Sequence, residues 1–119
     1  MLQKESILII ADNSGVKRIK IIGCRSSKTK IGELVTASVK VVNPTSNFKK
    51  GDKVKALIIS TKSYFHRKSN NTWIKFSKNA AILIKKEELK PFGTRIFFPI
   101  MKELMIKYNE LSSLSPEIL

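Results

Sequence analysis

Residues 11–23 read ADNSGVKRIKIIG, in which a cluster of turn-forming residues precedes a segment of mixed apolar and basic residues. Asp12 or Asn13 can accept a hydrogen bond from the backbone two residues further on, and Gly15 can adopt a positive φ angle. Apolar and basic side chains then alternate roughly every second position over Val16–Gly23, which is typical of a half-buried strand. The stretch therefore predicts a tight turn that leads into a strand with a basic outer face.

Asp12 is one of only nine acidic residues in a chain that carries 23 lysines and arginines. A carboxylate beside a basic strand could serve catalysis, bind a metal or fix a turn. The other acids are scattered along the sequence and form no evident catalytic or metal-binding set. We therefore interpret Asp12 as a structural residue that fixes the turn and could orient Lys17 or Arg18.

Further strands are expected where the same alternation recurs between turn residues. The predicted ranges are Ile7–Ala11, Leu34–Val42, Lys53–Thr61, Thr72–Ser77 and Ala80–Lys85. In the second of these ranges, one face is expected to carry Val35, Ala37, Val39 and Val41. In the third, one face is expected to carry Val54, Ala56, Ile58 and Ser60, and the other Lys55, Leu57, Ile59 and Thr61. Strands at this spacing, separated by Gly, Asn and Pro, indicate a mainly β protein built as a small antiparallel β-barrel.

A helix is expected only near the C-terminus. Pro99 can occupy the first helical turn, where its missing N–H group costs nothing. An apolar stripe follows at a spacing of four residues and is flanked by two methionines: Ile100, Leu104 and Tyr108, with Met101 and Met105. This pattern predicts an amphipathic helix that faces the core. The alternative is a methionine-lined binding surface.

The chain of 119 residues is long enough for one domain with one modest core. Its formal net charge is +14 and its pI is about 10.1, which indicates a polyanionic partner rather than a solvated surface alone. Residues 1–86 hold 19 lysines and arginines against four acids, whereas residues 87–119 hold four against five. Within the single domain 1–119, we therefore expect a basic barrel with hairpins over 1–86 and a near-neutral, protein-facing C-terminal strand and helices over 87–119.

Several functional classes are disfavoured by the residues present. The single cysteine, Cys24, excludes an internal disulfide and a cysteine-based zinc site. His66 is the only histidine, and no GxSxG, HExxH or GxxxxGK[ST] motif occurs. No apolar run approaches the roughly 18 residues of a membrane-spanning helix. We therefore expect no enzyme activity, catalytic residue, cofactor, metal, small-molecule substrate or membrane partner.

Three basic or polar links join the predicted strands: Arg25–Lys30, Thr45–Lys50 and Lys62–Asn71. Basic hairpins that reach out from a barrel suit contact with the phosphates of RNA. The third link also carries Tyr64 and Phe65, either of which could stack on a base. The alternative is that both aromatic side chains only pack the base of the hairpin.

Five blocks occur in order: ADNSGVKRIKIIG (11–23), KKGDKVKALIISTK (49–62), WIKFSKNAAILI (73–84), GTRIFFPIMKEL (93–104) and SLSPEIL (113–119). Together they resemble the large-subunit ribosomal protein family numbered fourteen, in its bacterial and organellar form. The resemblance implies a five-stranded barrel with a projecting β-ribbon and short C-terminal helices. It also implies a structural constituent of the large ribosomal subunit that binds large-subunit rRNA directly.

The same resemblance implies the remaining partners. These are neighbouring large-subunit ribosomal proteins, small-subunit rRNA at an intersubunit bridge, and a ribosome-silencing factor that docks near Gly93–Arg95. The residues expected to contact rRNA are Lys17, Arg18, Lys20, Lys49, Lys50, Lys62, Arg67 and Lys68. Those expected on the partner and bridge surface are Thr94, Arg95 and Phe98.

The chain departs from the family pattern in its hairpin turn and before its last helix. Asn70-Asn71 stands where family members usually have Asp-Gly, and asparagine tolerates the left-handed conformation that such a turn requires. Ser77-Lys78 replaces another Asp-Gly, and the link 62–71 looks slightly longer than usual. Phe98 replaces the glycine of a usual Phe-Gly-Pro, so it either fills a new protein contact or packs against the last helix.

A second hypothesis is a free nucleic-acid-binding barrel that acts as a regulator or chaperone, although the five ordered blocks argue against it. The compartment is inferred from composition. Lysine outnumbers arginine 19 to 4, which suits an A+T-rich genome, and MLQKES shows no leader peptide. We expect a mitochondrial ribosome and an organelle-encoded chain, with a plastid-like organelle or the bacterial cytoplasm as alternatives.

Overall fold

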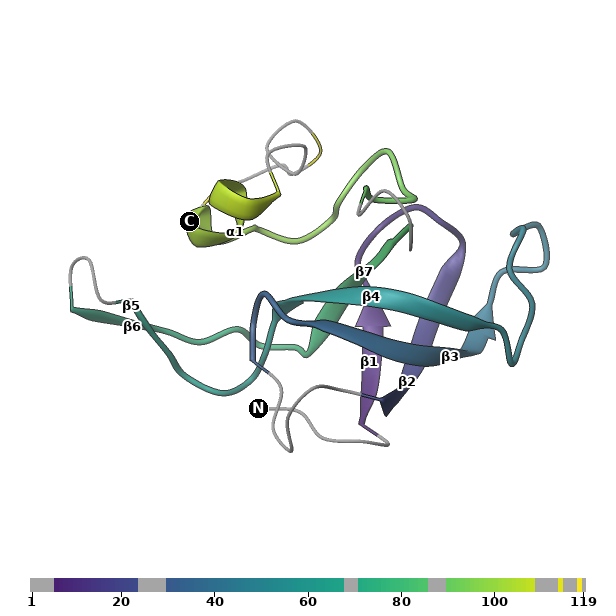
Figure 1. Cartoon of the computed structure of the whole chain (residues 1–119), viewed down its shortest axis with the longest axis horizontal. Coiled ribbons are helices and arrows are strands. Elements are labelled where there is room, and N and C mark those ends of the chain that lie inside the picture. The colour runs from purple at the N-terminus through teal and green to yellow at the C-terminus, as the bar shows by residue number, and fades with distance from the viewer. Residues whose placement is uncertain are drawn as a thin grey trace.

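The computed structural model describes residues 6–23, 30–67, 71–85 and 90–108, together with Leu114 and Ile118. Five strands close into a barrel in the order β1 (Ile7–Ile10), β2 (Val16–Gly23), β3 (Leu34–Val42), β4 (Lys53–Ser60) and β7 (Ala80–Ile84) (Figure 1). A separate two-stranded ribbon, β5 (Phe65–Arg67) and β6 (Thr72–Ile74), projects from it, and α1 (Lys102–Lys107) lies against the barrel. The predicted mainly β barrel with a projecting ribbon is confirmed.

One pairing in the barrel is parallel, which corrects the expectation of a purely antiparallel ring. β1 pairs with β7 in parallel through Ile9–Ala80 and Ile10–Ala81, and the four other pairings are antiparallel. The physical reason is that the barrel has an odd number of strands. Strands that alternate in direction around a closed ring of five must meet once in the same direction, so the parallel seam follows from the strand number.

The predicted strand bounds match β2 and β3 and overrun β1, β4 and β7 by one residue each. The expected strand Thr72–Ser77 ends at Ile74, because its partner β5 pairs only from Phe65, opposite Ile74, to Arg67. Strand β5 itself lies inside the link 62–71 and was missed. Asn71 has a φ angle of 54°, so the expected left-handed asparagine at the ribbon turn is confirmed.

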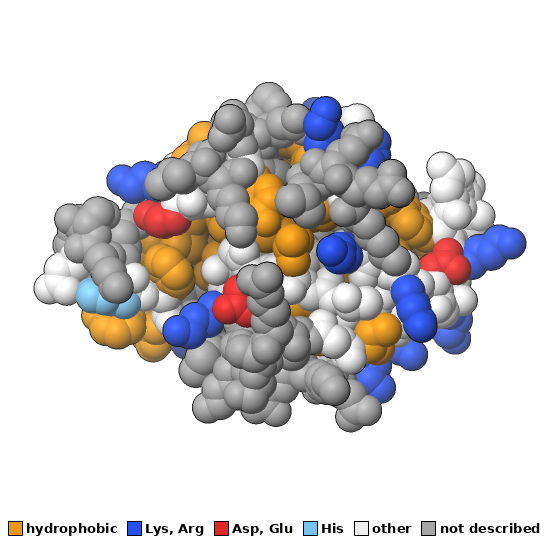
Figure 2. Space-filling view, viewed as in Figure 1, with side chains coloured by type: hydrophobic (Ala, Val, Ile, Leu, Met, Phe, Trp, Pro, Cys, Tyr) orange, Lys and Arg blue, Asp and Glu red, His pale blue; other side chains and the backbone are white. Residues whose placement is uncertain are grey.

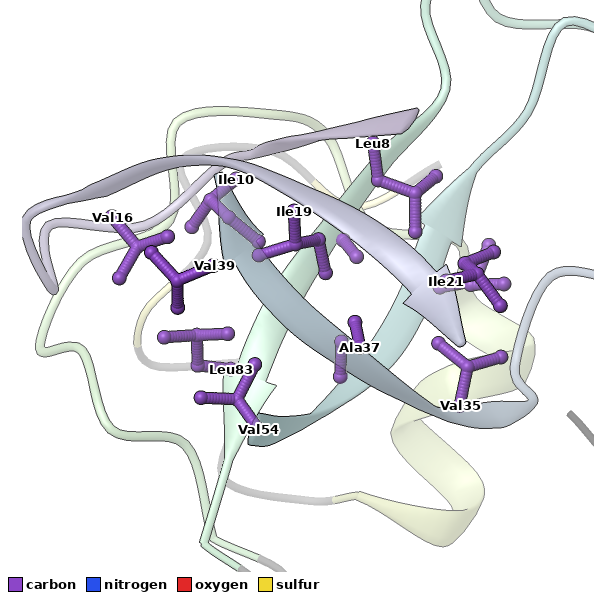
Figure 3. Packing of buried hydrophobic residues seen from close by; sticks show 13 residues of the cluster. Leu8, Ile10, Val16, Ile19, Ile21, Val35, Ala37, Val39, Val54 and Leu83 are labelled. Carbon is purple, nitrogen blue, oxygen red and sulfur yellow. The ribbon is translucent and has the colours of Figure 1, made fainter. Parts of the chain in front are cut away.

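The barrel interior is filled by one cluster of aliphatic side chains (Figure 3). The alternating residues Val35, Ala37 and Val39 of β3 point into it, as predicted. Val41 does not, and its side chain is 45% exposed. The register between β2 and β3 shifts near this point, because Arg18 pairs with Val41 while the next residue, Ile19, pairs with Val39. A β-bulge therefore turns Val41 outward and lets Val42 pack against the interior.

A second cluster lies outside the barrel wall and is called the outer core here. Leu57, Ile59, Ala80, Ile82 and Ile84 face outward from β4 and β7, yet each is at most 1% exposed. They are covered by residues that follow the barrel in sequence: Ile96, Ile100, Leu104 and Tyr108. Strands β4 and β7 are therefore buried on both faces, which explains their nearly continuous apolar sequences.

The predicted helical stripe is confirmed by burial, but the helix itself is shorter than expected. It begins at Lys102 rather than at Pro99, and Met101 is its N-cap residue. Ile100, Leu104 and Tyr108 all pack into the outer core. Met101 is fully buried, so it lines no binding surface, while the Met105 side chain lies outside the described residues. No helix in the described ranges is long and apolar enough to cross a membrane.

Candidate nucleic-acid interface

The turn at residues 12–15 is held by the buried carboxylate of Asp12. Oδ1 accepts hydrogen bonds from the backbone N–H of Ser14 (3.0 Å) and from its hydroxyl (2.6 Å). Oδ2 accepts one from the N–H of Leu83 on β7 (3.2 Å). The interpretation of Asp12 as a structural turn residue is confirmed. These bonds go to Ser14 and Leu83 rather than to Lys17 or Arg18, so the carboxylate also ties the turn to the parallel seam.

Gly15 closes the turn, as expected, with a φ angle of 97°. A Cβ atom here would stand 2.6 Å from Cβ of Ser46, so the loop between β3 and β4 can approach closely only because residue 15 is glycine. The Ser46 hydroxyl donates to the Ser14 carbonyl (3.1 Å), and the Asn43 N–H donates to the Gly15 carbonyl (2.8 Å). The turn and the β3–β4 loop therefore form one end of the molecule.

The bulge at the start of β2 places two cations side by side. Val16 and Ile19 point into the barrel, and the two residues between them, Lys17 and Arg18, are both exposed. A regular strand would have turned one of them inward, so the bulge doubles the positive charge presented at this point. The approximate alternation noted in the sequence is explained by this irregularity.

The β3–β4 loop adds Lys49 and Lys50 at the same end of the barrel, and both are exposed. The one acid in the loop, Asp52, accepts a hydrogen bond from the backbone N–H of Lys49 (2.8 Å). Its carboxylate thus shapes the turn. Figure 2 shows lysine and arginine side chains gathered around this end of the molecule.

A row of polar and basic residues crosses the outer side of the barrel from β2 to β4. Lys20 of β2 pairs with Ser38 of β3, and Ser38 in turn pairs with Lys53 of β4. Two residues further along β3 and β4, Thr36 pairs with Lys55. Residues directly opposite one another project on the same face of a sheet. Two interstrand spacings separate the strands that carry Lys20 and Lys53, or roughly 10 Å, which is close to the screening length of physiological salt. Their mutual repulsion is therefore only partly screened, and it would be relieved by an anion.

Lys40, Lys53 and Lys55 were missed as candidate contacts, although the alternation of Lys53 and Lys55 with buried Val54 and Ala56 was visible in the sequence. What the alternation could not show was which strands would lie beside β2. We define the basic face as the eight cations of β2, β3, the β3–β4 loop and the start of β4: Lys17, Arg18, Lys20, Lys40, Lys49, Lys50, Lys53 and Lys55.

Of the remaining predicted contacts, Lys62 and the backbone of Arg67 lie away from this face, at the ribbon (Figure 1). Lys62 is exposed at its base, where its backbone N–H donates to Oδ1 of Asn79 (2.8 Å). Arg67 belongs to β5, but its side chain lies outside the described residues, as does all of Lys68. The structure thus places five of the eight predicted residues on the basic face, whereas Lys62 lies at the base of the ribbon.

The predicted partner surface is fixed to the turn through Asn13. Oδ1 of Asn13 accepts hydrogen bonds from the N–H groups of Thr94 (2.8 Å) and Arg95 (3.3 Å), and Nδ2 donates to the Thr94 hydroxyl (2.8 Å). A Cβ atom on Gly93 would lie 2.8 Å from Oδ1 of Asn13 and 2.9 Å from Cβ of Asp12, so only glycine permits this contact. Thr94 and Arg95 are consequently held rigidly while their side chains face solvent.

Phe98 packs against the outer core and is partly buried. Of the two possibilities raised by the sequence, packing against the last helical region is therefore the one found within the chain. Its neighbour Phe97 is 55% exposed, and the Phe97 N–H donates to the Ala11 carbonyl (2.7 Å). Phe97, two residues after Arg95, is thus an exposed aromatic residue close to this segment that sequence reasoning did not select.

Among the described residues, no three histidine, cysteine, aspartate or glutamate side chains gather as a metal site would require. The arrangement as a whole is a rigid barrel with one basic side and one covered side. The chain was also compared with known protein families. The family described as ribosomal protein L14p/L23e has a model that matches residues 1–119.

Proposed function

The chain belongs to the ribosomal protein L14p/L23e family, and from that premise we propose that it binds large-subunit rRNA directly through its basic face. The family is one of structural ribosomal proteins of the large subunit and not of enzymes. The observation that carries the proposal is that the C-terminal region of the chain covers only one side of the barrel. The C-terminal region covers β4 and β7, whereas the outer sides of β2 and β3 carry exposed cations on a rigid sheet.

The basic face suits a phosphate backbone better than a single small anion. Its cations extend from the bulge in β2 to the β3–β4 loop and on to the first residues of β4. Each phosphate that a lysine or arginine neutralises releases counterions, so affinity should fall steeply with salt. Phosphate contacts orient a protein on RNA without reading sequence, and specificity then comes from the shape of the RNA.

The second proposed surface is that around Thr94, Arg95 and Phe97, which we assign to the intersubunit side. The Asn13 hydrogen bonds hold this segment rigidly, and residues 87–119 are nearly neutral, which suits contacts with protein as well as RNA. Neighbouring large-subunit proteins, small-subunit rRNA at a bridge and a ribosome-silencing factor are its proposed partners. Cross-linking of Thr94→Cys in assembled ribosomes tests this, and cross-links confined to the large-subunit interior would contradict it.

We further propose that the ribosome is mitochondrial. The support is compositional, because 19 of the 23 basic residues are lysine, as expected from an A+T-rich coding genome. Fractionating organelles before ribosomes are isolated identifies the compartment. Recovery of the chain with plastid or bacterial ribosomes would replace this assignment.

The test of the main proposal is sedimentation of ribosomal particles from the source cell at increasing salt. One copy per large subunit, released only at high salt, is expected of a structural rRNA-binding protein. A chain that acts as a free RNA-binding regulator would be substoichiometric and recovered mainly in ribosome-free fractions. That result would overturn the proposal.

A further inference from the structure

The ribbon carries an aromatic cluster on one of its two faces. In the register of β5 and β6, His66 lies directly opposite Trp73. Tyr64 and Lys75 are the next residues on the same face toward the base of the ribbon, because side chains alternate along an extended chain. Phe65 pairs with Ile74 on the opposite face. We call the first set, Tyr64, His66 and Trp73, the aromatic face.

The side chains of the aromatic face hold one another in place. The rings of His66 and Trp73 lie 4.6 Å apart between centroids, at an interplanar angle of 33°. Tyr64 meets Trp73 edge-on, with 6.4 Å between centroids and an angle of 88°. Nε2 of His66 lies 2.8 Å from Oδ1 of Asn71, and Nζ of Lys75 lies 5.2 Å from the centre of the Tyr64 ring. The cluster is thus organised before any partner binds.

Despite these contacts, the two largest rings remain mostly in water. Trp73 is 64% exposed and Tyr64 is 66% exposed, whereas Phe65 and Ile74 on the other face are only partly exposed. Figure 2 shows hydrophobic side chains beside the histidine at this end of the molecule. Adjacent, ordered and exposed aromatic side chains are typical of a binding surface, because they gain contact area at little cost in conformational entropy.

The charge of the surrounding sequence indicates which partner fits. Residues 53–86 contain nine lysines and arginines and no acidic residue, and five of those cations lie within residues 62–78. A polyanion that also presents flat aromatic groups matches such a surface. RNA with an unpaired base meets both conditions, since the base can stack on the indole while its phosphates meet the lysines.

We propose that the aromatic face is a stacking platform for an unpaired base of RNA, with Trp73 as the main stacking residue. The inference rests on the proposed rRNA-binding function and adds a second contact, at the opposite end of the molecule from the β3–β4 loop (Figure 1). His66, whose ring lies 4.6 Å from the indole, acts as a positioning residue for Trp73. Lys75, whose Nζ lies 5.2 Å from the centre of the Tyr64 ring, supplies a cation for a phosphate that flanks the stacked base.

The presence of a single tryptophan in the chain makes the test direct. The intact protein is titrated with a short single-stranded oligoadenylate and with an abasic oligomer of equal length and charge, and Trp73 fluorescence and affinity are followed together. Quenching by the oligoadenylate alone is expected. Trp73→Ala should weaken oligoadenylate binding roughly 5- to 100-fold and Trp73→Phe much less, because a phenyl ring still stacks.

Neither substitution should change binding of the abasic oligomer, whose phosphates can still meet the lysines. Thermal unfolding of each variant checks that the exposed site has been altered without loss of the fold. Equal binding of both oligomers without quenching would overturn the stacking platform and leave the proposed rRNA-binding function standing. Absence of salt-dependent binding to either oligomer would overturn both. Quenching by another ribosomal protein and not by RNA would assign the aromatic face to a protein partner instead.

Discussion

The two sides of the barrel differ in the burial of their outward-facing residues. On β4 and β7, outward-facing Ile59 and Ile82 are fully buried because the C-terminal region lies over them. On β2, the outward-facing positions include Lys17 and Lys20, and the apolar Ile22 is 40% exposed. The chain's own C-terminal segment therefore determines which side of the barrel carries the basic face, because cations can gather only where that segment leaves the sheet uncovered.

The strongest test of this comparison removes matched aliphatic side chains. Ile58 and Ile59 are adjacent in β4, fully buried and on opposite faces of the sheet. Ile58→Ala and Ile59→Ala should each lower the free energy of unfolding by about 2–5 kcal/mol, because each leaves a cavity in packed surroundings. Urea unfolding measures both. A loss at Ile59 below about 1 kcal/mol would show that the outer core is not part of the cooperative fold.

The next effect concerns Asp12, which links the turn before β2 to β7. Asp12→Ala leaves the buried N–H of Leu83 without this acceptor and should cost about 2–3 kcal/mol. Asp12→Asn is the control, since one side-chain oxygen can still accept and the loss should be smaller. Hydrogen exchange at Leu83, followed by NMR, locates the change. Unaltered protection in Asp12→Ala would mean that the turn and the seam are independent.

Asn13 allows a smaller test of the same junction. Asn13→Ala removes three hydrogen bonds to Thr94 and Arg95, all at an exposed site, and should lower stability by about 1 kcal/mol. The proposed bridge surface should lose order without unfolding of the barrel. Faster proteolysis near Arg95, with the barrel protected, is the expected readout. Uniform cleavage throughout the chain would instead indicate global destabilisation.

The contrast in charge between the uncovered and covered sides of the barrel is tested with one exposed lysine from each side. Lys17→Ala should weaken binding to an rRNA fragment and reduce the slope of log affinity against log salt by about 1. Lys102→Ala, on the covering helix, removes the same charge and should leave that slope unchanged. Filter binding at several salt concentrations compares them. Equal effects would show that net charge, rather than the basic face, governs binding.

The smallest expected effect concerns apolar residues on the uncovered side. Ile22→Ala and Val41→Thr alter exposed positions, so each should change the free energy of unfolding by less than about 0.5 kcal/mol. Thermal unfolding is the measurement. A loss comparable to that of Ile59→Ala would mean that a further segment covers this side as well.

The sequence alone determined the local features. Alternation located the barrel strands to within one residue, and the bonding preferences of Asp12 and Gly15 predicted the turn, because these patterns depend on neighbours in the chain. The apolar spacing of Ile100, Leu104 and Tyr108 predicted a buried stripe, although the helix proved to be shorter.

Tertiary structure decided what depends on contacts between distant residues. Closure of a five-stranded ring created the parallel seam. Pairing of β2 with β3 set two register shifts, one that exposes Lys17 and Arg18 together and one that turns Val41 outward. The ribbon register brought His66 to Trp73, and docking of the C-terminal segment decided which strands carry the basic face. Alternation defines two faces for each strand, but only packing in three dimensions determines which face meets water.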